Sequence, residues 1–369
     1  MSMFITLCMI AYNEENTLQQ ILNDFTSQDY DHSQIEVLLV DSASTDGTRK
    51  IMHEFARNNK NSSEAMRFRD VRVLDNPKRT LPCGWNVALA AYHGEAILKV
   101  DAHAAIPSDF VSKNVALLES GEDVTGGQRP NIIDDPTPWK ETLLLAESSM
   151  FGSSIAPYRN NPGKSYVKSM FHAAYRRKVF DTIGGFNENL ARTEDNEVHY
   201  RMRKAGFKLC FSPDIISYQH TRSSLKKMLH QKYANGYWIG LTSGVCPGCL
   251  SLYHFVPLAF VLAILLSTIL CLLFGATGIG EIAPDGTYGA MHVVRLIVYL
   301  LTGVMWGLYW LIALVMAVIA VIGAGNKRNI TCIVLPFLFF LLHISYGIGT
   351  LVGMIKMPFW VKGIEDGRD

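Results

Sequence analysis

The chain has 369 residues, with 34 Lys and Arg against 33 Asp and Glu, so its formal net charge is +1. This balance does not suggest a nucleic-acid partner, because binding to phosphates needs an excess of basic side chains. The length is enough for a sizeable core and about two structural regions. The charges are unevenly distributed, since between Cys246 and Asn326 only Glu281, Asp285 and Arg295 carry one.

The first 120 residues alternate between strand-like and helix-like patterns. Compact apolar runs predict four buried strands, at 4–10, 35–40, 71–74 and 96–100. The segments between them predict three helices, at 16–27, 45–55 and 82–91. Strands that alternate with helices predict an α/β fold with a mostly parallel, doubly wound sheet.

The following segments are less regular. Helices are expected over 140–150 and 193–205, with a turn over 183–186 between them. Carboxylates in the first turn of the second helix, after Thr193, are favourable to the helix dipole. The segment 223–239 has an apolar side, which fits either a helix lying in a membrane interface or a core-packed amphipathic helix.

Three apolar runs follow, at 252–274, 293–322 and 330–355. Each is long enough to cross a bilayer, which needs about 20 residues, and the second is long for a single span. Gly303 and Gly307 in the second run form a small-xxx-small pair that suits close helix packing. We therefore divide the chain into an N-terminal domain (1–222), an interface helix with a linker (223–250) and a membrane region (251–369).

Basic residues predict the orientation of these spans. The N-terminal apolar stretch is short and lacks a basic leader, so we expect no cleavable signal peptide. Lysines precede the first span, Lys327 and Arg328 lie between the second and third, and the loop after the first span has no basic residue before Arg295. The positive-inside rule then predicts a multi-pass plasma-membrane protein whose N-terminal domain is cytosolic.

Asp101 and His103 close the strand predicted at 96–100. Their side chains point to the same side, because side chains alternate along a strand. Such a pair can hold a divalent cation at the rim of a sheet, where α/β proteins bind their ligands. The sequence contains neither a G-x-G-x-x-G fingerprint after the first strand nor a phosphate-binding P-loop, so a metal ion is the obvious device for holding phosphate.

Four motifs occur in order along the chain: Ala11-Tyr12-Asn13-Glu14-Glu15, Val40-Asp41-Ser42-Ala43-Ser44-Thr45-Asp46-Gly47-Thr48, Val100-Asp101-Ala102-His103 and Thr193-Glu194-Asp195. Over about residues 3–240 the chain thereby resembles family 2 glycosyltransferases with the GT-A fold. The D-A-H form and the apolar C-terminal region are similar to the exopolysaccharide branch, such as the succinoglycan-type glucosyltransferases that extend lipid-linked sugars.

The resemblance implies a nucleotide-sugar pocket around the first two motifs. Asp41 would accept a hydrogen bond from the base, with uracil expected, and Ala11, Asn13 and Glu14 would line the same pocket. Asp101 would contribute to donor binding from the third motif. The alternative for Asp41 is that it only organises its turn, because Asp and Ser side chains bond to their own backbone there.

The resemblance also implies a metal. Asp101 and His103 would bind Mn²⁺ or Mg²⁺, which neutralises the charge that builds on the departing diphosphate. The nitrogen of His103 favours Mn²⁺ mildly, but the family usually carries a second acid at this position, so direct ligation by His103 is left open. His220 is a further candidate metal ligand, and an ordinary surface histidine is its alternative.

The fourth motif implies the acceptor side of the site. Asp195 would take the proton from the acceptor hydroxyl as that hydroxyl attacks the anomeric carbon, which inverts the configuration. Glu194 would contact the acceptor or orient the base, or would merely cap the helix. Trp238 could stack on an acceptor sugar, or anchor at the membrane interface, where aromatic residues are common.

We therefore expect a metal-dependent, inverting, membrane-anchored hexosyltransferase. It would move a sugar from a UDP-hexose to a hydroxyl of a polyprenyl-diphosphate-linked glycan in exopolysaccharide or capsule synthesis. A polyprenyl-monophosphate glycosyl synthase and a processive polysaccharide synthase are the enzyme alternatives, although residues 231–238 lack the Q-x-x-R-W of the latter. A transporter with a nucleotide-binding domain is the non-enzyme alternative, which the scarcity of ionisable residues in the spans disfavours.

Overall fold

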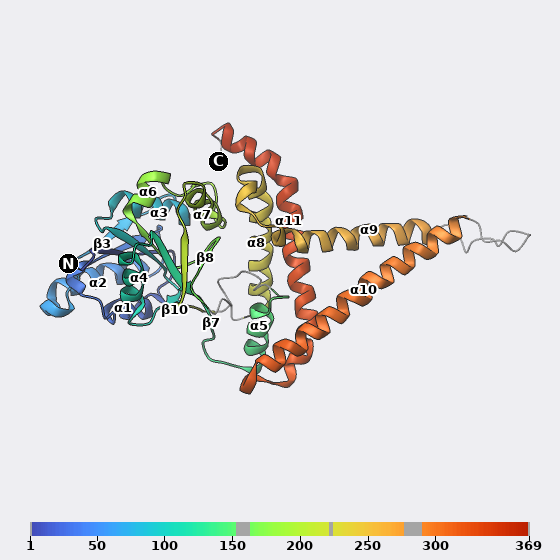
Figure 1. The fold of residues 1–369 in the computed structure, drawn as a ribbon, viewed down its shortest axis with the longest axis horizontal. Coiled ribbons are helices and arrows are strands. Elements are labelled where there is room, and N and C mark those ends of the chain that lie inside the picture. Colours follow the sequence, from blue (N-terminus) through green and yellow to red (C-terminus); the bar gives the residue numbers. More distant parts are fainter. Residues whose placement is uncertain (1, 153–162, 221–223, 277–289, 368–369) are drawn as a thin grey trace, which may run out of the picture. The chain divides into compact units, whose positions relative to one another are not determined.

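The computed structural model describes residues 2–152, 163–220, 224–276 and 290–367, drawn as a ribbon in Figure 1. The chain divides into two compact units. Unit 1 comprises Met1–Asp134, Ala156–Thr221 and Cys246–Leu250, and unit 2 comprises Asp135–Ile155, Arg222–Val245 and Ser251–Asp369. The units are therefore interleaved along the chain, whereas the predicted division was continuous. The roles assigned to 1–222, 223–250 and 251–369 stay predictions.

Unit 1 contains an eight-stranded sheet in the order β3-β2-β1-β4-β9-β6-β10-β8. Its parallel part contains the four predicted strands: β1 (Ile5–Ala11), β2 (Ile35–Asp41), β3 (Asp70–Asp75) and β4 (Ala96–Asp101). The rest of the sheet consists of β6 (Val124–Gln128), β8 (Ser165–Val167), β9 (Ala173–Arg176) and β10 (Leu209–Ile216). β9 is antiparallel to both β4 and β6, and β8 is antiparallel to β10. This topology confirms the predicted α/β fold with a mostly parallel sheet.

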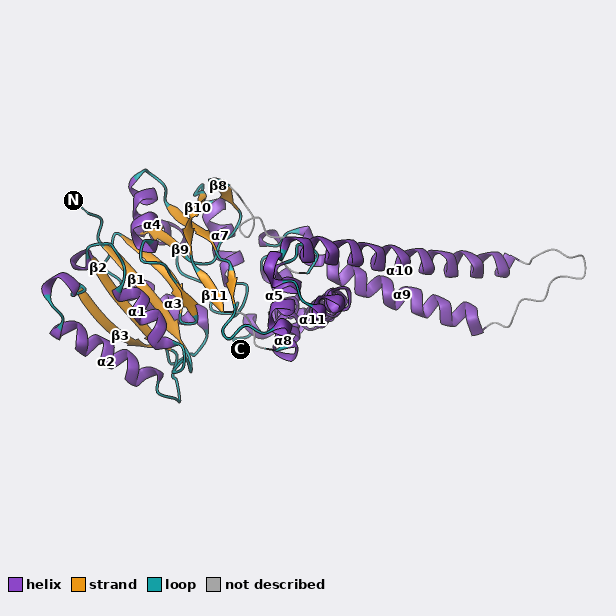
Figure 2. Ribbon diagram, turned by 90° about the horizontal axis from the view of Figure 1, so that it is seen from below, coloured by secondary structure: helices purple, strands orange, loops and turns teal. Residues whose placement is uncertain are grey.

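Helices cover both faces of the sheet (Figure 2). One face packs against α1 (Leu18–Thr26), α2 (Thr48–Asn61) and α4 (Phe110–Glu119). The other packs against α3 (Leu81–Ala91), α6 (Arg177–Ile183) and α7 (Glu194–Lys204). Every residue of β1 and β2 is buried, as expected for parallel strands with helices on both faces.

Short elements complete unit 1. A second, three-stranded sheet contains β5 (Ala104–Ala105), β11 (Tyr218–His220) and β7 (Asn131–Ile132), in that order. 3₁₀ turns occupy His32–Gln34, Glu64–Met66 and Pro247–Cys249. In the small sheet, Gln219 of β11 is paired with Ala104 of the antiparallel strand β5. His220 follows Gln219 and His103 precedes Ala104, so the register places these two histidines opposite each other.

Unit 2 is helical. It contains α5 (Pro138–Ser148), α8 (Leu225–Val245), α9 (Val256–Ala276), α10 (Ala290–Gly323) and α11 (Leu335–Glu365), with 3₁₀ turns at Leu252–Phe255, Gly325–Lys327 and Ile330–Val334. By length and composition, three segments are able to cross a membrane: Leu252–Phe274, His292–Gly323 and Ile330–Glu365. The three predicted apolar runs are therefore confirmed as helical. The third continues ten residues beyond its predicted end at 355.

Helices α8 and α11 approach one another closely through glycines. A Cβ added at Gly236 would lie 2.0 Å from the carbonyl oxygen of Tyr346, and one added at Gly353 would lie 2.1 Å from that of Tyr237. Backbone atoms cannot move away from such a contact unless the helices separate. Small residues thus set the spacing of this helix pair, as they do in many membrane proteins.

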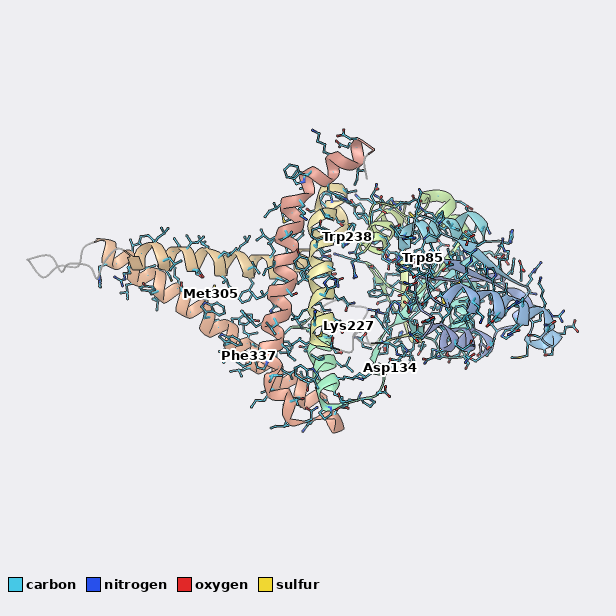
Figure 3. All side chains as sticks on the ribbon, turned by 180° about the vertical axis from the view of Figure 1, so that it is seen from behind. Trp85, Asp134, Lys227, Trp238, Met305 and Phe337 are labelled. Atoms are coloured by element: carbon cyan, nitrogen blue, oxygen red, sulfur yellow. The ribbon has the colours of Figure 1, made fainter. Side chains whose placement is uncertain are left out.

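Gly303 and Gly307, the small-xxx-small pair noted in the sequence, do not form a close helix contact within the described part of unit 2. A Cβ at Gly303 or Gly307 would meet no atom within 4 Å among the described residues. The pair lies on α10, whose side chains include Met305 (Figure 3) and are largely exposed. The motif recurs by chance, and only the tertiary structure identifies the glycines that need to be small.

The buried side of α8 also differs from the predicted apolar side. The residues predicted to share that side are Leu225, Met228, Leu229, Tyr233 and Tyr237, and only Met228 of these is buried. The buried residues of α8 are Met228, Lys232, Gly236, Ile239, Gly240, Leu241 and Thr242. Close backbone approach selects glycines for the buried side, so hydrophobicity alone is a poor guide here. The position of this helix in a membrane interface stays a prediction.

Candidate active site

The carboxyl ends of β1, β2 and β4 meet at one edge of the large sheet. The parallel register pairs Ala11 with Asp41 and Ile10 with Asp101. β1 lies between the other two strands, so Asp41 and Asp101 end on either side of it. Ligands of open α/β sheets bind at this edge.

The loops after β1 and β2 are bonded to each other. The Asn13 backbone N–H donates to Ser44 Oγ at 3.1 Å, and Asn13 Oδ1 accepts from the Thr45 N–H at 2.8 Å. The Glu14 N–H donates to Thr48 Oγ1 at 2.7 Å. Asn13 has a φ of 55°, a left-handed conformation that asparagine tolerates better than most residues. The first two motifs, about 30 residues apart in the chain, thus form one structure.

Asp41 is buried, and its two oxygens differ in their surroundings. Oδ1 accepts from the Ser44 N–H at 3.2 Å, which is the turn-organising bond that the alternative interpretation expects. Oδ2 lies 3.6 Å from Nη1 of Arg49 and has no hydrogen-bond partner among the described residues. A buried carboxylate oxygen without a hydrogen bond costs free energy, so this atom is suited to accept one from a ligand.

Asp101 is held by a histidine that the sequence did not single out. His172 Nε2 lies 3.2 Å from Asp101 Oδ2, and His172 Nδ1 lies 2.8 Å from Ser217 Oγ. Burial would raise the pKa of Asp101, but His172, His103 and Lys99 outweigh burial and hold that pKa well below its usual range. Asp101 is therefore a carboxylate at neutral pH.

The predicted metal ligands differ in their contacts. His103 acts electrostatically on Asp101, and His103 Nδ1 lies 3.4 Å from Glu14 Oε1. His220 instead has its Nδ1 2.8 Å from an oxygen of Asp134. Within the described residues, no group of three or more His, Cys, Asp and Glu side chains is arranged to hold a metal.

The residues present still fit a cation that arrives with its substrate. Mg²⁺ is commonly bound by one or two protein carboxylates together with substrate phosphates and water. Asp101 ends its strand as a partly exposed carboxylate, with His103 and Glu14 beside it. These three side chains are enough to hold an ion that is also bound by substrate phosphates. They are too few to hold an ion without the substrate.

Asp195 and Glu194 begin α7, as predicted. Asp195 Oδ1 is bonded to Nζ of Lys99, whose side chain is 4% exposed. Burial raises the pKa of Asp195, although Lys99 opposes the shift. Burial and the neighbouring Asp195 raise the pKa of Glu194 to about 8. Glu194 is therefore mostly protonated at neutral pH, and its Oε2 has no hydrogen-bond partner among the described residues.

Asp101 and Asp195 share this environment. Asp101 acts electrostatically on Asp195, and both carboxylates act on Lys99. The structure therefore brings together residues of the third and fourth motifs, and the register places Asp41 at the same sheet edge. Trp238 belongs to unit 2, where its ring lies 6.0 Å from that of Trp360 on α11 (Figure 3).

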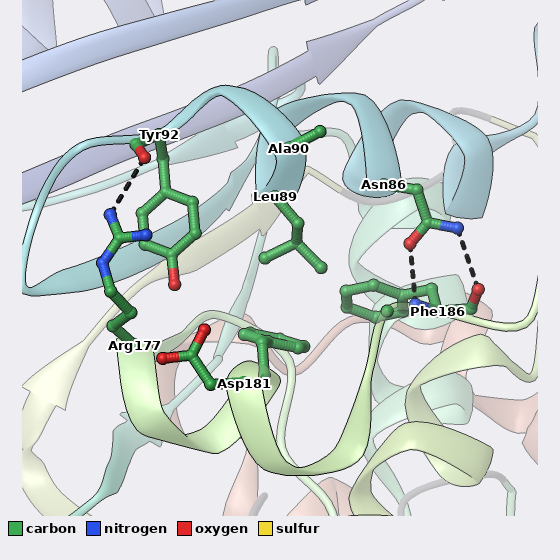
Figure 4. Close-up of a pocket in the computed structure, with 9 residues that line it drawn as sticks. Asn86, Leu89, Ala90, Tyr92, Arg177, Asp181 and Phe186 are labelled. Carbon is green, nitrogen blue, oxygen red and sulfur yellow. Dashed lines mark hydrogen bonds between the residues drawn. The ribbon is translucent and has the colours of Figure 1, made fainter.

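A pocket of about 410 Å³ opens elsewhere in unit 1, between α3 and α6 (Figure 4). Its lining residues are Asn86, Leu89, Ala90, Tyr92, Arg177, Phe180, Asp181, Gly185 and Phe186. None of them is a predicted site residue.

Sequence reasoning missed Lys99 and His172. Lys99 did leave a signal, because a lysine within the apolar strand 96–100 is unusual. His172 left none, since it comes close to Asp101 only because β9 runs antiparallel to β4.

Comparisons with known proteins identify the family. A family described as "Glycosyl transferase family 2" matches residues 6–184, and one described as "Glycosyl transferase family group 2" matches residues 96–350. The chain therefore belongs to the family 2 glycosyltransferases. A solved structure, the mannosyltransferase PcManGT from Pyrobaculum calidifontis in complex with GDP-Man and Mn²⁺, matches with a TM-score of 0.52 and 17% identity, over 96% of this chain and 88% of that one. This likeness supports the GT-A fold.

Two curated relatives match this chain at low identity. The succinoglycan biosynthesis protein ExoA of Rhizobium meliloti (strain 1021) is 27% identical over 54% of this chain and 58% of its own length. A dolichyl N-acetyl-alpha-D-glucosaminyl phosphate 3-beta-D-2,3-diacetamido-2,3-dideoxy-beta-D-glucuronosyltransferase of Methanococcus voltae is 24% identical over 71% of this chain and 80% of its own length. These likenesses support the exopolysaccharide-type branch of the family.

Proposed function

We propose that the protein is a membrane-anchored, inverting glycosyltransferase. It takes a sugar from a nucleotide donor, a UDP-hexose, and adds it to a hydroxyl of a polyprenyl-diphosphate-linked glycan in exopolysaccharide or capsule synthesis. The observation that carries the proposal is that Asp41 and Asp101 end their strands at one sheet edge, where Asp101 acts on Asp195, in a chain with three apolar helices.

On the donor side, the loops after β1 and β2 hold the nucleotide. Asp41 Oδ2 accepts a hydrogen bond from the base, because that buried oxygen has no other hydrogen-bond partner among the described residues. Ala11, Asn13 and Glu14 form the rest of this pocket. Asp101 and His103, with His220 as a candidate further ligand, would hold Mn²⁺ or Mg²⁺, which would supply positive charge to balance the departing diphosphate.

On the acceptor side, Asp195 accepts the proton of the attacking hydroxyl. The oxygen of that hydroxyl forms a bond to the anomeric carbon while the bond from this carbon to the diphosphate breaks, which inverts the configuration. The raised pKa of Asp195 suits a base, because proton transfer is most efficient when the pKa of the base approaches the working pH. Glu194, protonated beside it, is able to donate a hydrogen bond to the acceptor.

The helices of unit 2 place the enzyme at its lipid-linked acceptor. We assign the protein to the plasma membrane as a multi-pass protein with a cytosolic catalytic unit, on the basis of its apolar segments and basic loops. Trp238 on α8 is the candidate that stacks on an acceptor sugar. A lipid-bound acceptor raises the effective concentration of substrate at a membrane-bound site.

The test uses the full-length chain in detergent with a membrane lipid extract as acceptor. Radiolabelled UDP-glucose, UDP-galactose, UDP-N-acetylglucosamine and GDP-mannose are supplied in turn, with Mn²⁺, with Mg²⁺ or with a chelator. We expect metal-dependent transfer of one sugar to the lipid fraction, and loss of transfer in Asp195→Asn with UDP binding retained. Full turnover by Asp195→Asn would refute the base assignment.

A polyprenyl-monophosphate glycosyl synthase is the second candidate. It is favoured by a 28% match, over 48% of this chain and 51% of its own length, to an undecaprenyl-phosphate 4-deoxy-4-formamido-L-arabinose transferase of Proteus mirabilis. Its acceptor is already anionic and needs little help from a base. Transfer to bare undecaprenyl phosphate that survives Asp195→Asn would favour this candidate.

A further inference from the structure

Lys99 is a lysine inside the core of unit 1. It lies on β4, in the run Ala96-Ile97-Leu98-Lys99-Val100-Asp101, and is 3% exposed. Lysine is almost never fully buried unless it is paired, because an ammonium loses its hydration there. Side chains alternate along a strand, so Lys99 points to the same face of the sheet as Asp101.

Three groups surround the ammonium of Lys99. Nζ is bonded to Oδ1 of Asp195, and it lies 5.3 Å from the centre of the Trp85 ring and 5.8 Å from that of Phe186. Both ring distances are within the range of cation–π attraction. The lysine therefore connects β4 to α3, to the turn after α6 and to the first turn of α7.

The turn that carries Phe186 is fixed to α3. Asn86 of α3 accepts from the Phe186 N–H at 2.7 Å and donates to the Phe186 carbonyl oxygen at 2.9 Å (Figure 4). A Cβ at Gly185 would lie 2.4 Å from Asn86 Oδ1, so this residue has to be glycine for the turn to approach α3. The position of the Lys99 ammonium is thus determined by three elements and not by its own flexible side chain.

The carboxylate of Asp195 is more exposed than its partner. Its side chain is 18% exposed, against 4% for Lys99, so the ammonium lies on the protein side of the carboxylate. A bond to Oδ1 from a fixed donor restricts rotation of the carboxylate, and Oδ2 is then the oxygen left for the acceptor. Asp101 acts on the same ammonium, so Lys99 lies beside both the donor and the acceptor carboxylates.

We propose that Lys99 is a positioning residue, which orients Asp195 for removal of the proton from the acceptor hydroxyl. This inference rests on the proposed function, in which Asp195 is the base. Lys99 touches no substrate in this role and acts through Asp195. A misplacement of about 1 Å in a reacting group can reduce a rate roughly 10²-fold, so an effect of this size on turnover is expected when the ammonium is removed.

The experiment compares Lys99→Met, Asp195→Asn and the double variant in the transfer assay. The donor is the nucleotide sugar from the panel above that turns over fastest, and UDP binding with Mn²⁺ is measured by calorimetry. We expect Lys99→Met to lower kcat roughly 10²-fold and to change the dissociation constant of UDP less than about threefold. We expect the double variant to be no slower than Asp195→Asn, because residues that act as a unit are not additive.

A matched control removes a lysine from an exposed ion pair in the same unit. Lys113 Nζ lies 2.7 Å from Asp109 Oδ2 on α4, and Lys113→Met should transfer sugar at the wild-type rate. Wild-type kcat in Lys99→Met would overturn the proposal, as would a double variant that shows the product of the two single losses. If Asp195→Asn keeps full transfer, the base assignment itself fails, whatever Lys99 does.

Should Lys99→Met fail to fold, Lys99→Arg keeps the charge and displaces the donor atoms. We expect it to fold, as judged by circular dichroism, with kcat lowered at least tenfold. Wild-type kcat in a folded Lys99→Arg would show that the position of the donor is immaterial and would overturn the proposal.

Discussion

A buried ion pair joins α5 to α8 within unit 2. Lys232 Nζ lies 2.8 Å from Glu147 Oε1, and the two side chains are 6% and 10% exposed. Removal of one partner from a buried pair leaves an uncompensated charge and costs about 3–5 kcal/mol. Replacement of both partners by apolar side chains of similar volume is commonly neutral or stabilising. Lys232→Met should therefore be strongly destabilising, and Glu147→Leu combined with Lys232→Met should restore most of the loss.

Amide hydrogen exchange measures this effect within the helices concerned. A tenfold change in an equilibrium constant corresponds to about 1.4 kcal/mol, so a cost of about 3–5 kcal/mol should make peptides from α5 and α8 exchange roughly 10²- to 4 × 10³-fold faster in Lys232→Met. In the exposed Lys113–Asp109 pair, Lys113→Met should change exchange in α4 less than about fivefold, because exposed pairs contribute at most about 1 kcal/mol. The reasoning is refuted if Lys232→Met exchanges like the wild type, or if the double variant exchanges as fast as Lys232→Met.

Two further predictions concern helix packing and pH. A Cβ at Gly240 would lie 2.5 Å from the Thr350 carbonyl oxygen. Gly240→Leu should therefore separate α8 from α11 and lower the melting temperature, at a cost of about 1–3 kcal/mol. Gly303→Leu should leave the melting temperature unchanged, and equal melting temperatures in the two variants would contradict the packing argument. The raised pKa of Glu194, about 8, means that the folded state holds this proton more tightly than the unfolded state. The stability that Glu194 contributes is complete below pH 4.5 and is lost as pH rises to about 8. Glu194→Gln should therefore reduce the fall in melting temperature with pH over that window. An unchanged dependence of melting temperature on pH would argue against a buried, protonated Glu194.

Much of the sheet is predictable because its signals are local. The strands β1, β2, β3 and β4 are compact apolar runs, and a polar loop follows each of the first three. Parallel strands joined by helices bring their carboxyl ends to one edge, so the neighbourhood of Asp41 and Asp101 follows from the order of the elements. The contacts of Asn13 with the next motif are consistent with this proximity.

Other features depend on long-range pairing. β9 inserts between β4 and β6 and runs antiparallel to both, and this reversal brings His172 to Asp101. Lys99 and Asp195 are 96 residues apart, and no periodicity in the chain links them. Likewise, nothing in the sequence distinguishes the glycines of α8 that contact α11 from Gly303, where an added Cβ would meet no atom within 4 Å among the described residues.

The sequence by itself therefore determined the first four parallel strands, the helices between them, the order of the motifs and the apolar segments, because each depends on the pattern of side chains over a few neighbouring residues. Only the tertiary structure decided the partner of each buried charge and the glycines at which helices touch. The physical reason is that a buried charge or a close backbone contact is stabilised by whichever distant segment the folded core brings beside it, and that choice is made by the packing of the whole unit.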